Sequence, residues 1–323
     1  MSTLYPLTFQ PIFKERVWGG RTLETLYRKR LPPDVPIGES WEISDRPGDE
    51  SVVANGPLAG RTLRSLLAEQ AADIVGSARC APGGRFPLLC KILDARDRLS
   101  LQVHPQSPAL GEPKTEMWHI AKADPGAQLY VGLKGGVSRD DFERALHRGT
   151  VEECFHTIPV RTGDTMFLPS GRVHAIGAGL VIFEIQQNSD TTFRVFDWNR
   201  VGLDGKPRDL HVSESLQSIA FDDVEPALAA GEPFVRGHFG MRPVVRHALF
   251  NVDLVHAEMQ DVLALDDPRL RVIAVVNGRV RATGGGRSET LDAGQFCVIP
   301  AGLTGAALAA DYGATFLHVE AGT

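Results

Sequence analysis

The sequence predicts a mainly β protein made of two β-barrel or jelly-roll units with a few peripheral helices. The first observation is the distribution of turn-forming residues: 33 glycines and 21 prolines are spread between many short apolar runs of the 323-residue chain. This distribution is typical of β-sandwiches and barrels. The second observation is a motif that occurs twice, and the third is that few segments have helical periodicity. A hydrophobic content of 43% is enough for a sizeable core at this length.

Two segments have a clear helical pattern. Residues 62–75 read TLRSLLAEQAADIV, with apolar residues at helical spacing. In the second segment, Ser138–Arg148, the serine can cap the start of the helix and Gly149 can end it. We expect both helices to pack outside the barrels. Residues 203–235 are rich in turn formers and acids around one short helical stretch, which places a domain junction near residue 235.

The repeated motif is a strand between two turns. Gly163–His174 reads GDTMFLPSGRVH, and Gly294–Gly305 reads GQFCVIPAGLTG. In each copy a turn glycine precedes a buried strand, and a Pro-x-Gly turn presents the next side chain at the mouth of the barrel. That side chain is an imidazole in the first copy and is missing in the second. Only the first copy can therefore supply a metal ligand at this position.

The spacing of this motif resembles the second conserved motif of the cupin superfamily, in which the histidine is a metal ligand. The resemblance implies a double-cupin chain. We expect residues 1–235 to form a catalytic, metal-binding cupin domain with helical insertions. We expect residues 236–323 to form a cupin-like domain without metal ligands.

The overall charge excludes some classes of partner. The formal net charge is -6 and the isoelectric point is near 5.9, so neither nucleic acid nor an anionic membrane is an expected partner. An anionic substrate needs a local basic pocket. The sequence has no secretory-type leader and no apolar run of membrane-spanning length, which predicts a cytoplasmic protein. Four cysteines without short paired spacing predict small buried residues rather than a zinc ribbon or a disulfide framework: Cys80, Cys90, Cys154 and Cys297.

A metal constellation is indicated by residues 99–104, which alternate strictly. Gln102 and His104 share the polar face of this predicted strand. A solvent-exposed edge is the alternative for that face. Glu116 and His174 complete a set of two imidazoles, a carboxylate and an amide, which suits Zn, Fe or Mn and leaves a position for water or substrate. The absence of thiolates favours a catalytic site over a structural one. His119 is the nearest rival, and by alternation it points away from Glu116.

Several longer motifs are similar to those of the short bacterial type I mannose-6-phosphate isomerases, also called phosphomannose isomerases. They are VWGG at 17–20, GESWEIS at 38–44, LCKIL at 89–93, SLQVHP at 100–105, PKTEMW at 113–118, PSGRVHAI at 169–176 and EIQQNSDTTFRVFDWNR at 184–200. The resemblance implies one zinc ion per chain, surrounded by Gln102, His104, Glu116 and His174. It also implies that Arg194 is an active-site residue.

The activity implied by this resemblance is the interconversion of mannose 6-phosphate and fructose 6-phosphate through a cis-enediol, a step of carbohydrate metabolism. The reaction needs a base, a group that stabilises the oxyanion and a cationic pocket for the phosphate. Arg194 shares a strand face with Thr192 and Phe196 and can stabilise charge. Lys114 and Asp190 are both candidates for proton handling, and the sequence does not choose between them.

Three further residues are candidates for substrate binding. Lys91 and Arg200 can contact the phosphate, although each can equally be a structural ion-pair partner. Trp18 can form an apolar wall against the sugar, or it can be a core tryptophan. Two other functions remain as alternatives: a metal cupin enzyme acting on another sugar or sugar phosphate, and a noncatalytic sugar-binding cupin. We expect a monomer or a weak homo-oligomer.

Overall fold

The computed structural model describes residues 4–323, and most of the sheet pairings in that range are antiparallel. The chain divides into two compact units. The first unit contains residues 13–40 and 92–228. The second unit contains residues 4–12, 41–91 and 229–323. The mainly β class predicted from the sequence is confirmed.

The first unit contains two sheets. The six-stranded sheet has the order β1 (Ile12–Gly20), β2 (Ile37–Ile43), β5 (Leu88–Ala95), β12 (Leu180–Gln187), β7 (Glu116–Ala123) and β10 (Thr165–Leu168). The five-stranded sheet has the order β13 (Phe193–Phe196), β6 (Leu101–Val103), β11 (His174–Ile176), β8 (Gln128–Leu133) and β9 (Phe155–Pro159). Strands β2 and β5 each continue into residues that belong to the second unit.

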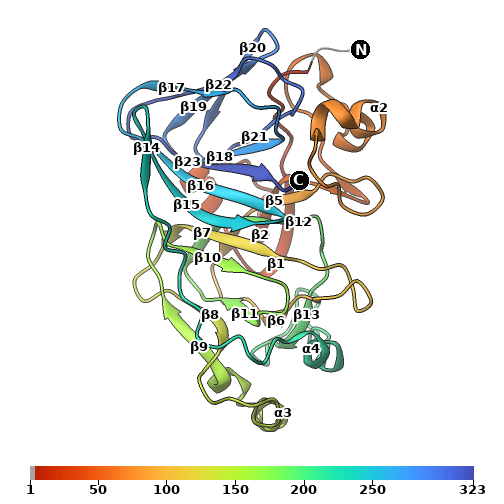
Figure 1. The fold of residues 1–323 in the computed structure, drawn as a ribbon. Coiled ribbons are helices and arrows are strands. Elements are labelled where there is room, and N and C mark those ends of the chain that lie inside the picture. Colours follow the sequence, from red (N-terminus) through yellow and green to blue (C-terminus); the bar gives the residue numbers. More distant parts are fainter. Residues whose placement is uncertain (1–3) are drawn as a thin grey trace. The chain divides into compact units, whose positions relative to one another are not determined.

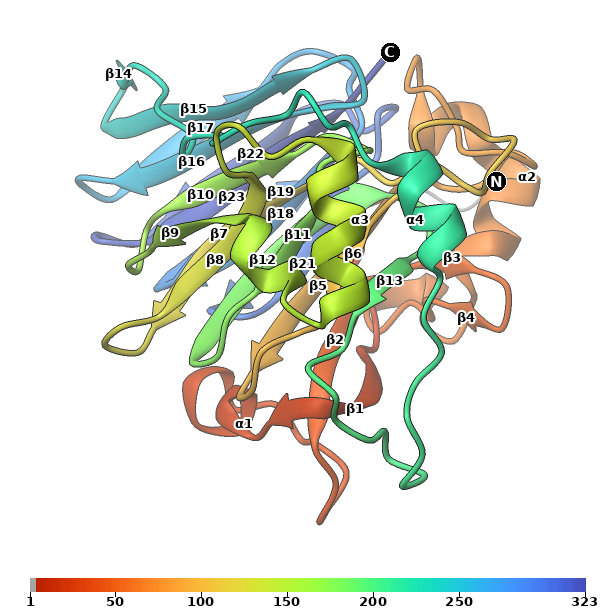
Figure 2. The same ribbon diagram turned by 90° about the horizontal axis from the view of Figure 1, so that it is seen from below.

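The two sheets of the first unit enclose an apolar core. Trp118 and Ile120 of β7 meet Leu129 and Val131 of β8 in this cluster. The opposite face of the five-stranded sheet is also covered. Figure 2 shows α3 (Arg139–Arg148) lying over it, and Phe142 of that helix packs in the cluster that holds the apolar residues of β6. The polar face of β6 is therefore the inner face, because helices cover the other one.

The predicted helices are present at the predicted places. Helix α2 (Leu63–Val75) begins after Thr62, whose hydroxyl accepts a hydrogen bond from the Ser65 amide. Helix α3 begins at a capping box formed by Ser138 and Asp141. The short helical stretch is α4 (Val212–Ser218). Three shorter helical elements were not predicted, since each has fewer than seven residues: α1 (Thr22–Tyr27), η1 (Gly56–Leu58) and η2 (Val151–Cys154).

The second unit repeats the two-sheet plan and is drawn mainly in cyan to blue in Figure 1. Its six-stranded sheet has the order β14 (Phe234–Arg236), β15 (Phe239–His247), β16 (Phe250–Ala257), β23 (Thr315–Ala321), β18 (Arg271–Asn277) and β21 (Phe296–Ile299). Its four-stranded sheet has the order β17 (Asp261–Leu265), β22 (Ala306–Ala310), β19 (Arg279–Gly284) and β20 (Arg287–Asp292). A small ladder joins β3 (Asp45–Arg46) and β4 (Asp49–Glu50).

The repeated motif forms the same structure in both units. Gly163 and Gly294 have φ angles of 95° and 83°, the left-handed region that favours glycine. Each is followed by a short strand, β10 or β21, that pairs with β7 or β18 respectively. The repeat therefore predicted a real supersecondary unit.

The compact units are interleaved along the chain, whereas the sequence prediction divides it once, at residue 235. Both divisions place the final segment in one unit, which begins at Ala229 in the structure. The assignment of catalysis to residues 1–235 stays a prediction. All four cysteines are free, and Cys80 is only half-buried, in contrast to the expectation for that residue. Over the described range, no helix has the length and apolar character needed to cross a membrane.

Candidate metal centre

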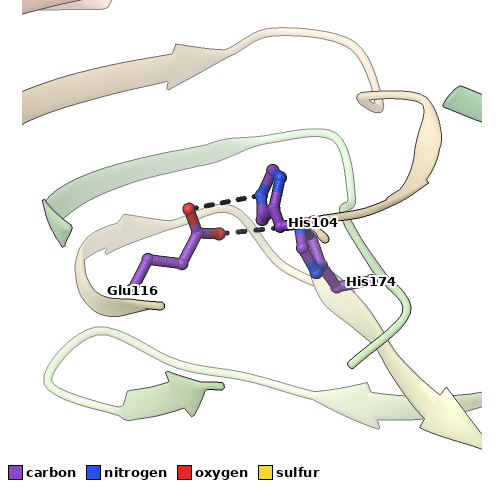
Figure 3. Close-up of side chains that lie close together, drawn as sticks. All are labelled: His104, Glu116 and His174. Atoms are coloured by element: carbon purple, nitrogen blue, oxygen red, sulfur yellow. Dashed lines mark ion pairs between the residues drawn. The ribbon is translucent and has the colours of Figure 1, made fainter. Parts of the chain in front are cut away.

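Three buried side chains converge between the two sheets of the first unit. His104 follows β6, Glu116 begins β7 and His174 begins β11, and one potential ligand atom from each lies within 4.8 Å of the others. Figure 3 shows the two imidazoles facing the carboxylate. Each Nε2 lies 3.5 Å from a different oxygen of Glu116. The predicted histidines and glutamate therefore form one cluster.

The register of the five-stranded sheet extends this cluster. Gln102 on β6 lies opposite His174 on β11 and opposite Arg194 on β13. Residues directly opposite in antiparallel strands point to the same face. The Gln102 amide nitrogen lies 3.2 Å from Nε2 of His174. A half-turn of this amide would bring its oxygen toward the cluster as a fourth ligand.

Hydrogen bonds to carbonyl groups fix the tautomers of both histidines. Nδ1 of His104 donates to the Thr191 carbonyl at 2.8 Å, and Nδ1 of His174 donates to the Arg172 carbonyl at 2.9 Å. A carbonyl oxygen can only accept, so the proton is on Nδ1 in each ring. The lone pair is then on Nε2, the nitrogen that faces Glu116. This is the orientation that metal-binding imidazoles have.

Buried acceptor atoms without a hydrogen bond show whether a cation would suit this site. Within residues 4–323, Nε2 of His104 and both oxygens of Glu116 are buried and lack a hydrogen bond. Leaving such atoms buried and unpaired is costly. A divalent cation would satisfy all of them, since imidazole nitrogen and carboxylate oxygen are borderline to hard donors. The residues present therefore fit a metal ion.

The protonation states of the two histidines and the glutamate also suit metal binding. Burial, followed by the charge of Lys114, lowers the pKa of His104 to about 4. Burial likewise lowers the pKa of His174. Burial opposes ionisation of Glu116, but the charge of Lys114 outweighs it and holds the pKa of this carboxyl well below its usual range. Neutral imidazoles and an ionised carboxylate are the forms that bind metal.

Lys114 is buried between two carboxylates. Its Nζ lies 2.9 Å from Glu116 Oε2, in an ion pair without hydrogen-bond geometry, and 3.8 Å from Glu184 Oε1. Burial alone would lower the pKa of Lys114, but Glu116 and Glu184 raise it. Trp118 Nε1 donates to Glu184 Oε2 at 3.0 Å. The sequence prediction missed Glu184, although the spacing from Glu184 to Gln186 on one strand face was a usable signal.

Arginine side chains gather beside Arg194. Its Nη1 donates to the Asp209 carbonyl at 2.6 Å, and its buried Nε lacks a hydrogen bond within the part of the chain that the structure describes. Burial and the neighbouring Arg208 lower the pKa of Arg194. Arg208 and Arg200 both donate to the buried Asp197 carboxylate. Arg208 was not predicted, because its segment is irregular and gives no periodic signal.

The other residues predicted to bind substrate or transfer protons differ in burial and in their neighbours. Asp190 is exposed, and its charge contributes to raising the pKa of Lys114. Trp18 is buried in the apolar cluster with Trp118, as its core interpretation expects. Lys91 belongs to the second unit, where its Nζ lies 5.0 Å from the centre of the Trp41 ring.

A two-sheet β-barrel with this buried His/Glu/His set, a lysine and an arginine on the inner face defines a cupin-type protein with a candidate metal centre. The model of the family described as "Phosphomannose isomerase type I, catalytic domain" matches residues 7–127. The mannose-6-phosphate isomerase ManA of Bacillus subtilis is 33% identical over 309 residues, which cover 93% of this chain and 95% of the relative. The chain belongs to the type I phosphomannose isomerase family.

Further matches in sequence and in structure are also to mannose-6-phosphate isomerases. A mannose-6-phosphate isomerase of Streptococcus mutans is 39% identical over 219 residues, covering 65% of this chain and 66% of the relative. The crystal structure of the Bacillus subtilis mannose 6-phosphate isomerase superposes with a TM-score of 0.87 at 28% identity and covers 98% of this chain and 99% of that one. A mannose 6-phosphate isomerase described as bound with zinc and yttrium has a TM-score of 0.75 at 17% identity, over 98% of this chain and 100% of that one, and so shows the fold alone.

Proposed function

We propose that the chain is a zinc-dependent isomerase that interconverts mannose 6-phosphate and fructose 6-phosphate through a cis-enediolate. Family membership over nearly the whole chain supports the activity. The observation that carries the metal dependence is the buried cluster of His104, Glu116 and His174, in which Nε2 of His104 and both Glu116 oxygens lack a hydrogen bond. Gln102 is proposed as the fourth protein ligand.

The reaction moves hydrogen between two carbons. From the open-chain aldose, a base removes the proton on carbon 2, and the electron pair forms the double bond between carbons 1 and 2 while oxygen 1 takes the negative charge. Protonation at carbon 1 and transfer of the hydroxyl proton from oxygen 2 to oxygen 1 then give the ketose. The protein has to move protons and to stabilise the charge on oxygen 1.

The metal ion would supply Lewis-acid stabilisation of the sugar oxygens. Arg194 is proposed to stabilise the enediolate, because a guanidinium stays charged and offers two parallel donors. Its unpaired Nε supports this role. Lys114 is proposed to bind and orient a sugar oxygen rather than to act as the base, because Glu116 and Glu184 favour its protonated form. Asp190 is the proposed proton carrier, since it is exposed and four residues before Arg194.

The phosphate is proposed to bind near Arg200 and its neighbour Arg208. Both guanidiniums share the single buried carboxylate of Asp197, so positive charge exceeds negative charge among these three side chains. Trp18 and Lys91 remain weaker proposals as substrate contacts, because Trp18 is buried in the core and Lys91 lies over Trp41.

A coupled assay tests the proposal. The formation of fructose 6-phosphate from mannose 6-phosphate is measured before chelation, after chelation and after zinc is restored. We expect turnover that chelation abolishes and zinc recovers. Turnover that survives complete metal removal would contradict metal dependence. Metal binding without turnover on any hexose phosphate would favour the noncatalytic sugar-binding alternative.

A further inference from the structure

Strand β13, which carries Arg194, lies at the edge of the five-stranded sheet, where β6 pairs with one side of it. An edge strand presents backbone N–H and C=O groups that need other partners. Residues 208–211, the return segment of the loop after β13, supply these partners at Arg194. The His211 N–H donates to the Arg194 carbonyl at 2.8 Å, and the Arg194 N–H donates to Nδ1 of His211 at 3.2 Å. The imidazole of His211 therefore replaces the backbone acceptor of a neighbouring strand.

The return segment also holds the side chain of Arg194. The Asp209 carbonyl, two residues before His211, accepts a hydrogen bond from Nη1 of Arg194 at 2.6 Å. The backbone and the guanidinium of Arg194 are thus both bound by the same short segment. The position of the guanidinium depends on where this segment lies along β13.

The guanidinium needs such an anchor. Burial, followed by the charge of Arg208, lowers the pKa of Arg194, so both act against a cation at this place. An arginine side chain also gains considerable rotamer freedom when it is released. Without the Asp209 carbonyl, the charged group would favour solvent over the inner face of the sheet.

The return segment is fixed at both of its ends. At its start, Arg208 forms a two-pronged pair with the buried Asp197 carboxylate: Nε donates to Oδ2 at 2.7 Å and Nη2 to Oδ1 at 2.6 Å. At its end the chain enters α4, which packs beside β13 (Figure 2). His211 directly precedes this helix, and its imidazole binds the strand. The Nδ1 contact is therefore the side-chain bond that joins the segment to β13 next to Arg194.

The chemistry of this bond determines which side chains can replace His211. A backbone N–H can only donate, so Nδ1 carries the lone pair and the proton of the neutral ring is on Nε2. The ring centre lies 6.0 Å from that of Phe193. Phenylalanine can keep this aromatic contact but has no acceptor. Asparagine loses the ring, yet its Oδ1 follows Cγ as Nδ1 does and can accept the same N–H.

We propose that His211 is a positioning residue for the isomerase reaction. By accepting the Arg194 N–H it keeps the return segment on β13, and the Asp209 carbonyl then holds the guanidinium where it stabilises the enediolate. His211 acts through Arg194 and does not contact the substrate. The inference rests on the proposed function, because it requires Arg194 to act in catalysis.

A double-mutant cycle on turnover tests the proposal. We expect kcat to fall about tenfold in His211→Phe, because a misplaced catalytic group slows the reaction while zinc content stays parental. In the Arg194→Ala background the same change should have little further effect, since the guanidinium that it misplaces is absent. His211→Asn should recover most of the lost kcat. His147→Phe, which replaces an exposed histidine of α3, is the matched control and should keep parental turnover.

Two kinetic results would overturn the inference: parental kcat in His211→Phe, or an equal loss of kcat with and without the Arg194 side chain. An equal loss would mean that His211 acts on the fold or on another group. Parental turnover in Arg194→Ala would instead contradict the proposed role of Arg194, and this inference would fall with it. The two failures are therefore distinguishable.

An NMR measurement on the parent keeps the test decisive if His211→Phe does not fold. Long-range proton–nitrogen spectra of the imidazole rings, recorded in alkaline buffer, report which ring nitrogen carries the proton, and the signals missing from His211→Asn identify His211. We expect the proton on Nε2 and a free lone pair on Nδ1. A proton on Nδ1 would remove the acceptor for the Arg194 N–H and would overturn the proposal.

Discussion

The two barrel units have the same strand pairing but place side chains of opposite charge at the equivalent position. In the first unit the position opposite the motif strand holds Glu116, and the unsatisfied atoms around it are lone pairs that suit a cation. In the second unit the same position holds Arg271, and the unsatisfied atoms are nitrogens. The barrel fixes where polar side chains can be buried, whereas the residue type at one register position decides whether they can bind a metal ion.

Removing the carboxylate from the first unit should give the largest effect. Glu116→Gln keeps the shape of the side chain but loses its charge, so we expect metal affinity to fall by about a hundredfold or more. Competition with a chromogenic chelator measures the affinity, and circular dichroism checks the fold. Gln102→Ala is the comparison variant and should lose less. An unchanged affinity in Glu116→Gln would place this residue outside the ligand set.

Replacing Arg194 should separate catalysis from metal binding. Loss of an oxyanion-type contact typically costs roughly a hundredfold to a thousandfold in turnover. We expect such a loss in Arg194→Ala with parental metal content and Tm, and partial recovery in Arg194→Lys, which keeps the charge but not the planar fork. Near-normal turnover per folded, zinc-loaded molecule would make Arg194 a structural residue.

Acid should weaken the second unit through His318. Burial, followed by Arg271, Arg236 and Arg246, lowers the pKa of this imidazole to about 3, whereas it is about 6.5 in an unfolded chain. Below pH 6.5 the unfolded state therefore binds more protons, and stability falls as the pH falls toward 3. The expected loss is about 2 kcal/mol between pH 8 and pH 5.

Urea unfolding in phosphate-free buffer across this pH range measures the effect. The slope of unfolding free energy against pH should be shallower in His318→Gln, while His104 and His174 contribute equally to both proteins. Parallel pH profiles for the parent and His318→Gln would show that His318 does not titrate differently on folding.

The smallest effect is expected at the motif position that lost its histidine. Gly305 has a φ angle of 64°, and no atom lies within 4 Å of the position that a Cβ would take. Gly305→Ala should therefore cost about 1 to 2 kcal/mol of stability through backbone strain and leave turnover unchanged. Denaturant unfolding and the coupled assay check this together. A folded Gly305→Ala protein without activity would show that the second unit takes part in catalysis.

The sequence predicted those features that have a local signal. The Gly/Pro motif identified the repeat, strand alternation placed Gln102 with His104, and the capping serine located helix α3. Lys114 was correctly placed beside Glu116. What could not be predicted depends on strands distant in sequence. The pairing of Lys114 with Glu184, and of Asp197 with Arg208, arises only when separate segments meet.

The interleaved units had no sequence signal for the same reason. Residues 41–91 contain strands and a helix of ordinary composition, and only long-range pairing assigns them to the second unit. Likewise the charge reversal between Glu116 and Arg271 depends on sheet register. Spacing along one strand cannot reveal which residue lies opposite it.

Metal stoichiometry tests most directly the claim that only the first unit binds a metal ion. Elemental analysis of the purified protein and of the His104→Ala/His174→Ala double variant, each with its fold checked, is the decisive measurement. We expect one divalent metal ion per parent chain and none in the double variant. Two equivalents in the parent, or one equivalent retained by the folded double variant, would contradict a single metal centre at His104, Glu116 and His174.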